Sequence, residues 1–164
     1  MNGESCLELR IGQGIDVHRF QVGRPLVLGN VNIPSDIGLE GHSDADVLLH
    51  AIMDALLGAT GKPDIGYFFP NTNPLYKDIN SGELFDVVWA GVVKDGWSLV
   101  NVDCTILAER PKLMPHFSSI RKRIAELFSA DPERIGLKAT TAEGLGFVGR
   151  SEGIFASAVV LLSR

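Results

Sequence analysis

Cysteine, basic charge and long apolar runs are all scarce in this sequence. Only two cysteines occur, Cys6 and Cys104, and they form neither a CxxC pair nor a disulfide framework, which predicts a reduced, intracellular protein. The 15 Lys and Arg residues are outnumbered by 20 Asp and Glu, and the net charge of -5 argues against general binding to nucleic acid or anionic membranes. No stretch reaches the ~18 apolar residues of a membrane span, and the N-terminal residues lack the apolar core of a signal peptide. We therefore expect a cytoplasmic protein that binds neither nucleic acid nor membrane.

The length and composition suit a single globular domain. The chain has 164 residues, of which 45% are hydrophobic and 21% are charged, and one core commonly forms at roughly 100 to 200 residues. We find no internal repeat, low-complexity tract or linker that would divide it. Residues 1–164 are therefore predicted to form one domain, with residues 1–8 as a poorly ordered N-terminal extension.

Hydrophobic periodicity predicts alternating strands and helices. The best helix covers residues 43–61, with Ser43 as its N-cap and Asp46 at the third helical position, as in a capping box. The last strand is apolar on both faces, which is typical of a central strand or of one buried against another subunit. The last strand covers residues 153–162, and the other strands are expected near residues 9–17, 25–34, 99–108 and 135–141. The other helices are expected near residues 82–95 and 118–129. This order predicts an α/β (α+β layered) fold, a mixed β-sheet with helices packed on one face.

A proline- and asparagine-rich segment, residues 63–80, interrupts this alternation. Pro63, Pro70 and Pro74 favour irregular structure over helix or strand. Long loops in compact domains are often functional, so we expect this one to contribute to a site.

A possible metal site combines a strand with the best helix. Asp16 and His18 lie two residues apart, so on a strand they share one face. A lone pair of this kind is common by chance, and a metal site needs another ligand. His50 lies on the helix stripe that also carries Asp46 and Asp54, either of which could accept a hydrogen bond from its ring and so orient it. Together, Asp16, His18 and His50 would form a two-His, one-carboxylate set that is typical of catalytic zinc, and such ligands also accept Mn or Fe. The alternative is a solvated helix face.

Three further segments could bind phosphate groups or other ligands. His42 and Ser43 precede the helix, where free backbone N–H groups attract an anion. A simple N-cap is the more common role for a serine such as Ser43 and is compatible with anion binding, whereas a loop histidine such as His42 is usually just exposed. The turns at residues 108–116 and 138–150 end strands and could offer backbone groups to a ligand. Taken alone, polar glycine-rich turns of this kind are more often simple connectors.

Five motifs together are similar to one known family. "GIDVHRF", "GHSDADVLLHAIMDALLG", "DIGYFFPNTNP", "AERPKLMPH" and "KATTAEGLGFVGRSEGI" resemble the 2-C-methyl-D-erythritol 2,4-cyclodiphosphate synthases of the non-mevalonate isoprenoid pathway, from about Arg10 to Leu162. The resemblance implies a bacterial cytoplasmic lyase that cyclises 4-diphosphocytidyl-2-C-methyl-D-erythritol 2-phosphate and releases CMP. It also implies a homotrimer with active sites between subunits, one Zn²⁺ per subunit, and a second Mg²⁺ or Mn²⁺.

The resemblance assigns roles to individual residues. It implies that Asp16, His18 and His50 bind zinc, that Glu143 binds the second cation, and that His42 and Thr141 stabilise the transition state. The implied substrate contacts are Asp16, His18, His42, Ser43, Asp64, Ile65, Gly66, Phe69, Pro70, Asn71, Thr72, Asn73, Ala108, Glu109, Arg110, Pro111, Lys112, Leu113, Met114, Thr140, Thr141, Ala142, Glu143, Phe147 and Arg150. Phe147, Arg150 and Glu152 are implied to surround a central cavity of the trimer. Asn71 and Asn73 stand where the family usually carries aspartate, and Gly144 where it often carries a lysine or another side chain.

Two other functions use the same residues. A metal-dependent phosphoesterase would have the same metal ligands but a water molecule as nucleophile. A non-catalytic trimeric scaffold would use zinc only to hold strand against helix, but structural zinc sites usually have four protein ligands, and the sequence offers three obvious ones.

Overall fold

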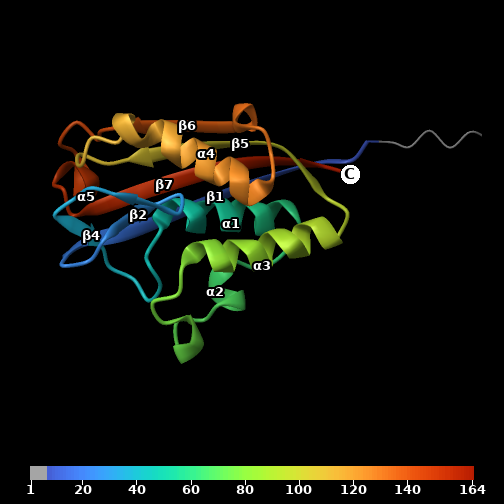
Figure 1. Cartoon of the computed structure of the whole chain (residues 1–164), viewed down its shortest axis with the longest axis horizontal. Helices are drawn as coiled ribbons and strands as arrows, with labels where there is room; N and C mark the ends of the chain where they lie inside the picture. The colour runs from blue at the N-terminus through green and yellow to red at the C-terminus, as the bar shows by residue number, and fades with distance from the viewer. Residues whose placement is uncertain (1–6) are drawn as a thin grey trace, which may run out of the picture.

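The computed structural model describes residues 7–164, which form one mixed sheet with helices packed against it (Figure 1). The sheet has five strands in the order β4-β1-β7-β5-β6. All neighbouring pairs are antiparallel except β5 and β6, which are parallel. The strands are β1 (Leu9–Val22), β4 (Ile37–Leu39), β5 (Ser98–Leu107), β6 (Ile135–Thr140) and β7 (Gly153–Ser163), and β2 (Leu26–Leu28) and β3 (Val31–Ile33) form a separate hairpin. The predicted mixed α/β fold is confirmed, and the last strand is central, which is one of the two arrangements that its apolar faces predicted.

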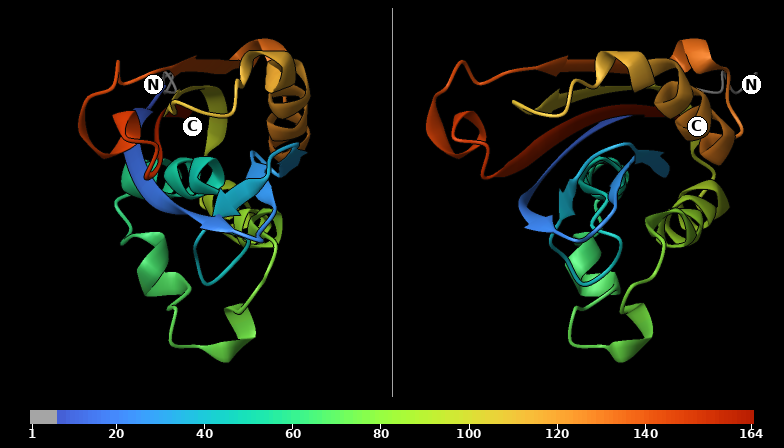
Figure 2. Two further views of the ribbon diagram at one scale, coloured as in Figure 1. Left: turned by 90° about the vertical axis from the view of Figure 1, so that its left-hand side faces the viewer. Right: turned by 60° about the vertical axis from the view of Figure 1, so that its left-hand side comes forward.

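Three long helices complete the fold: α1 (Val47–Ala59), α3 (Ser81–Lys94) and α4 (Phe117–Phe128). Figure 2 shows α1 lying against the curved sheet, and α1 packs on β1 and β7 as well as on α3. Because α1 has neighbours on opposite sides, nearly all of its side chains are buried. Shorter helices are α2 (Ile65–Phe68) and α5 (Gly146–Gly149), with single 3₁₀ turns η1 (Pro74–Tyr76), η2 (Met114–His116) and η3 (Pro132–Arg134).

Two glycines in β1 allow α1 to lie directly on the strand. A Cβ atom on Gly14 would lie 2.1 Å from the carbonyl oxygen of Ala51, and one on Gly12 would lie 2.0 Å from that of Ala55. Only residues without a side chain permit backbones to approach so closely. Gly12, Gly14, Asp16 and His18 alternate along one face of β1, so the close contact also brings the Asp-x-His pair against the helix.

The opposite face of β1 carries large apolar side chains that remain exposed in the single chain. Ile11, Ile15 and Val17 are 72%, 56% and 47% exposed. In the sheet register Ile11 pairs with Leu161 and Val17 with Phe155, both only partly buried, so the apolar surface continues across β7. A contiguous apolar sheet face of this kind is typical of a surface that another protein covers.

Local details differ from the sequence-based expectations at two helix starts. The N-cap of α1 is Asp46, whose carboxylate accepts hydrogen bonds from the backbone N–H groups of Leu48 and Leu49. Ser43 is therefore not the cap. The segment predicted to be irregular contains α2 and η1, because Asp64 and Asn73 each cap a short turn with a side-chain oxygen.

The N-terminal part of the predicted extension lies outside the described residues. Within the described part, Glu8 and Arg164 form two backbone hydrogen bonds that join the residue just before β1 to the residue that follows β7. Among the helices of residues 7–164, none has the length and apolar character needed to span a bilayer.

Candidate active site

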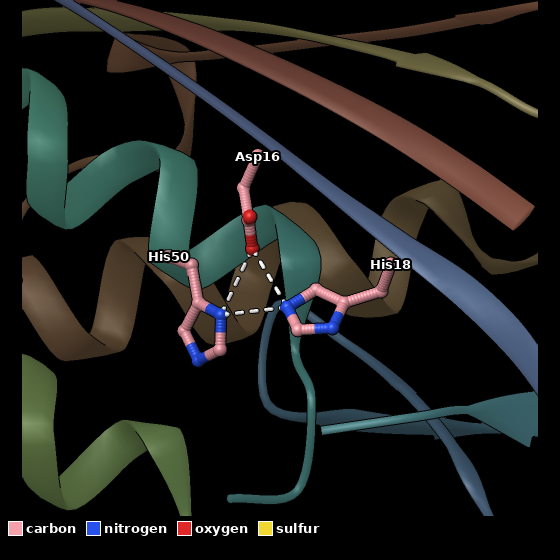
Figure 3. Close-up of side chains that lie close together, drawn as sticks. All are labelled: Asp16, His18 and His50. Atoms are coloured by element: carbon pink, nitrogen blue, oxygen red, sulfur yellow. Dashed lines mark hydrogen bonds and ion pairs between the residues drawn. The ribbon is translucent and has the colours of Figure 1, made fainter. Parts of the chain in front are cut away.

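Asp16, His18 and His50 converge at the contact between β1 and α1 (Figure 3). Asp16 Oδ2 lies 2.9 Å from His18 Nε2 and 2.9 Å from His50 Nδ1, and the two ring nitrogens are 3.2 Å apart. His50 is buried, and the other two are partly buried. The prediction that these three side chains meet is confirmed.

The spacing of the three atoms fits a tetrahedral metal ion. Ligands at about 2.0–2.1 Å from zinc are separated from one another by roughly 3.3 Å. The three separations of 2.9, 2.9 and 3.2 Å are close to that value. Three protein ligands leave one position of a tetrahedron for a water or substrate oxygen, which is the pattern of a catalytic site.

The protein environment keeps the carboxylate charged. Burial raises the pKa of Asp16, but hydrogen bonds and charge from His18 and His50 outweigh it and hold that pKa well below its usual range. Burial lowers the pKa of His18, but the hydrogen bond and charge of Asp16 more than offset it, so the His18 pKa lies above its ordinary value. An ionised carboxylate beside two imidazoles is a suitable donor set for Zn²⁺ or a similar divalent ion.

The outer nitrogens of both rings have hydrogen-bond partners. His18 Nδ1 lies 2.5 Å from the carbonyl oxygen of Glu40, while His50 Nε2 lies 3.0 Å from Ser81 Oγ and 3.4 Å from Ser43 Oγ. Such partners fix the tautomer and orientation of a ligating ring.

Neither Asp46 nor Asp54 takes the predicted place beside the His50 ring. The Asp46 carboxylate accepts from the backbone N–H groups of Gly29 and Asn30 as well as those of the first turn of α1, because a side chain at the N-cap lies closest to free donors. Asp54 accepts from the N–H of Ile65 and so joins α1 to α2.

A cavity of about 510 Å³ opens beside the candidate metal ligands His18 and His50. Its lining residues come from β1, from the chain before α1, from α1, from the proline-rich segment and from α3: His18, Gly41, His42, Ser43, His50, Ile65, Gly66, Phe69, Pro70, Asn71, Thr72, Tyr76 and Leu84. His42 Nε2 also lies 3.2 Å from the carbonyl oxygen of Asn73, and Asp64 caps α2 at the cavity edge. The structure thus brings one group of sequence-predicted contacts around His18 and His50.

A second cavity, of about 580 Å³, lies at the ends of β5 and β6. These strands are parallel, so their following loops emerge at the same edge, and Ala108 N donates to Thr140 O at 3.1 Å. The cavity is lined by Ala108, Glu109, Pro111, Lys112, Leu113, Met114, Pro115, Phe117, Ala139, Thr140 and Thr141. Arg110 does not line it, since its guanidinium lies 5.7 Å from the centre of the Phe20 ring.

The loop after β6 is ordered by two glutamates. Glu109 accepts hydrogen bonds from Ala142 N and Gly144 N, and Thr141 Oγ1 donates to Glu143 Oε1 at 2.5 Å. The two cavities have no lining residue in common. Within the described part of one chain, His42 and Thr141 therefore line different cavities.

Phe147 and Glu152 line a third hollow, together with Val17, His18, Arg19, Phe20, Ile37 and Ser151. Arg150 does not line it but forms an ion pair with Glu152, with an Nε to Oε1 distance of 2.7 Å. His18 lines both this hollow and the first cavity.

The sequence analysis did not identify Ser81, Asp44 or the Glu40 carbonyl as neighbours of the two histidines. Ser81 and the Glu40 carbonyl contact the outer ring nitrogens, and Ser81 donates hydrogen bonds to Asp44. Ser81 begins α3 and lies 31 positions from His50 in the sequence, so no local pattern connects them. Asp44 was visible in the "HSDAD" segment, but its position gave no sign of which side chain it contacts.

The mixed α/β fold places two histidines and a carboxylate beside a cavity. These features define the class of protein as a candidate metal-dependent enzyme. The chain belongs to the YgbB family, whose model matches residues 9–163. It is 54% identical to a 2-C-methyl-D-erythritol 2,4-cyclodiphosphate synthase from Lysinibacillus sphaericus, over 94% of this chain and 98% of the relative. It is 56% identical to the protein of that name from Geobacillus thermodenitrificans, over 94% and 97%.

Solved structures agree with these sequence relatives. The fold matches the bifunctional IspDF of Campylobacter jejuni with a TM-score of 0.92 and 42% identity, covering 96% of this chain and 42% of that one. It matches a 2C-methyl-D-erythritol-2,4-cyclodiphosphate synthase in a CDP-bound form with a TM-score of 0.86 and 39% identity, covering 93% of this chain and 99% of the other.

Proposed function

We propose that the chain is a phosphorus-oxygen lyase that cyclises 4-diphosphocytidyl-2-C-methyl-D-erythritol 2-phosphate. An oxygen of the 2-phosphate forms a bond to the β-phosphorus, the bond from that phosphorus to the oxygen bridging to the α-phosphate breaks, and CMP leaves with that oxygen. The observation that carries the proposal is the convergence of Asp16, His18 and His50 at one cavity in a chain whose curated relatives bear this synthase name.

The metal ligands would act on the diphosphate. Asp16, His18 and His50 would hold a Zn²⁺ ion, which when bound would supply Lewis acidity toward the diphosphate. His42 and Ser43 line the same cavity and would position the phosphate. The segment from Asp64 to Asn73 would hold the erythritol part against them. Bringing the two phosphates together in one geometry lowers the barrier, and such orientation can contribute as much as about 7–11 kcal/mol in well-oriented reactions.

The cavity at the ends of β5 and β6 would bind the cytidine and its phosphate. Its lining residues Ala108, Lys112 and Met114 belong to the segment that the family resemblance assigns to this role. Glu143 would hold Mg²⁺ or Mn²⁺, which would neutralise charge on the phosphates, and Thr141 would stabilise the transition state with His42.

We further propose that the active site forms between subunits of a homotrimer. Two facts support this: the cavities of His42 and Thr141 are separate within one chain, and the apolar face around Ile11, Ile15 and Val17 is open. A neighbouring subunit on that face would bury it and could bring the two half-sites together. The native mass should be about three times 17.7 kDa, and a monomer in light scattering at working concentration would contradict the proposal.

A bacterial cytoplasmic location belongs to the same proposal, supported by the low cysteine content and the bacterial relatives.

A product analysis distinguishes the three candidate functions. The protein is incubated with the diphosphocytidyl substrate, zinc and magnesium, and the products are resolved by ³¹P NMR. The synthase gives CMP and a cyclic diphosphate, a phosphoesterase gives CMP and a linear phosphate, and a scaffold gives no product. His50→Ala should lose both stoichiometric zinc and the cyclic product, and retention of full zinc by elemental analysis would refute the ligand assignment.

A further inference from the structure

We infer that Ser81 and Asp44 are positioning residues for the metal centre. They hold the proton of the His50 ring on Nε2, so that Nδ1 is the nitrogen that offers its lone pair to the metal. This inference deepens the proposed function and rests on its assignment of Asp16, His18 and His50 as metal ligands. Ser81 is fully buried at the first turn of α3, and it contacts His50 on the side of the ring opposite Asp16.

Asp44 fixes the direction of the hydrogen bonds that connect Asp44, Ser81 and His50. Ser81 Oγ donates to Asp44 Oδ1, and Ser81 N donates to Asp44 Oδ2 at 2.9 Å. A serine hydroxyl has one hydrogen and two lone pairs. Because that hydrogen is given to a carboxylate that can only accept, the Ser81 oxygen is left as an acceptor toward His50, 3.0 Å away.

The consequence for His50 follows from the two nitrogens of a neutral imidazole. When a metal is bound and Nε2 carries the hydrogen that Ser81 accepts, Nδ1 no longer donates to Asp16, and its lone pair is directed at the position between Asp16 and His18. His18 is fixed in the complementary way, since its Nδ1 can only donate to the Glu40 carbonyl, which leaves Nε2 free to bind a metal. Both rings are therefore held with lone pairs directed at the same point as the Asp16 carboxylate.

Ser43 is the weaker of the two hydroxyl partners of His50. Its oxygen lies 3.4 Å from His50 Nε2, compared with 3.0 Å for Ser81, and it also accepts from Ala45 N. The Asp44 carboxylate accepts from Ser81 N, Ser81 Oγ and Asp46 N, so replacing it with asparagine leaves one oxygen for three donors and no longer fixes the direction of the Ser81 hydroxyl.

The test measures zinc affinity in the full chain by competition with a chromophoric chelator. Loss of an outer partner of a metal ligand typically weakens metal binding by about 10–100-fold. We expect that loss for Ser81→Ala and for Asp44→Asn. The double variant should bind zinc about as weakly as the weaker single variant, because both residues act through one contact. Asn80→Ala is the matched control: Asn80 is the neighbouring N-cap of α3 and contacts Gly82 N, so its loss loosens the same helix end and leaves zinc affinity unchanged.

A second readout separates positioning from general loosening. In zinc-loaded protein labelled with ¹⁵N-histidine, the Nε2 proton of His50 should be protected from exchange with water in the wild type and lose that protection in Ser81→Ala. The Nδ1 proton of His18, held by Glu40, is an internal control and should not change. If the wild type binds zinc but Ser81→Ala matches it in affinity and in the His50 signal, this inference is refuted while the metal centre stands. If the wild type itself binds no zinc, the metal centre of the proposed function fails as well.

Discussion

Replacing Gly14 with alanine should damage both the stability of the chain and its metal centre. A Cβ atom at this position would lie 2.1 Å from Ala51 O and 2.6 Å from Ala55 N, whereas ordinary contacts lie between 3.4 and 4 Å. Both neighbours are backbone atoms of α1, so the whole helix must move by more than about 1 Å. Overpacking of this kind typically costs 1–3 kcal/mol, and we expect about 3 kcal/mol here because no flexible side chain can yield.

The same movement would carry His50 away from Asp16 and His18. Metal–ligand distances tolerate only about 0.2 Å of change, so zinc affinity should fall together with the free energy of unfolding. Urea unfolding followed by circular dichroism, at fixed protein concentration, measures the first effect, and chelator competition measures the second.

Gly58→Ala is the matched control on the same pair of elements. Its Cβ would meet only Gln13 O, at 3.7 Å, which is ordinary contact. Since alanine is favoured over glycine inside a helix by roughly 0.5–1 kcal/mol, this variant should be slightly more stable than the wild type. A Gly14→Ala protein whose free energy of unfolding lies within about 0.5 kcal/mol of the wild type, with zinc retained, would refute the close-packing argument.

Three further predictions test the interface, the second cation and the buried carboxylate. Ile15→Glu should give a folded 17.7 kDa monomer in light scattering, because a charge replaces an apolar side chain whose burial between subunits is worth about 1.5–3 kcal/mol. As a control, Val87→Glu, at a similarly exposed position on α3, should leave the trimer intact. Glu143→Gln should weaken the Mg²⁺ or Mn²⁺ dependence of activity with zinc still bound, and an unchanged metal titration would count against it. Burial raises the pKa of Asp46 to about 6 from 3.8, with backbone donors opposing the shift, so the native state binds this proton more tightly than the unfolded chain. The free energy of unfolding should therefore decrease as the pH rises from about 4 to about 6, by at most roughly 3 kcal/mol, and Asp46→Asn should remove that slope in urea unfolding.

The sequence predicted the elements better than their ends. The long helices and most strands were identified because apolar periodicity extends over many residues, as in β7. Residues 25–34, predicted as one strand, instead form the β2–β3 hairpin, because the chain turns at Gly29 and Asn30, and the three-residue strand β4 was too short to be predicted. The N-cap of α1 was misplaced, because Ser43 and Asp46 are both good caps, and the choice depends on the β2–β3 turn, where Gly29 and Asn30 also donate to Asp46.

The apolar face of β1 shows a different limit. Ile11, Ile15 and Val17 indicated a strand, but the face that α1 covers carries Gly12, Gly14, Asp16 and His18. Apolar residues normally mark the buried side, and here a second copy of the chain is the proposed cover, so one chain's periodicity could not identify which side α1 would occupy.

The sequence by itself determined that Asp16 and His18 share a face, because the two-residue repeat of a strand is set by the covalent backbone. It likewise placed His50 on a helix. Only the tertiary structure decided that the strand and the helix meet closely enough for the three side chains to converge, through the missing side chains of Gly12 and Gly14. It also decided which nitrogen of each ring faces the metal position, since Glu40, Ser81 and Asp44 come from separate segments that reach the site only when the chain folds.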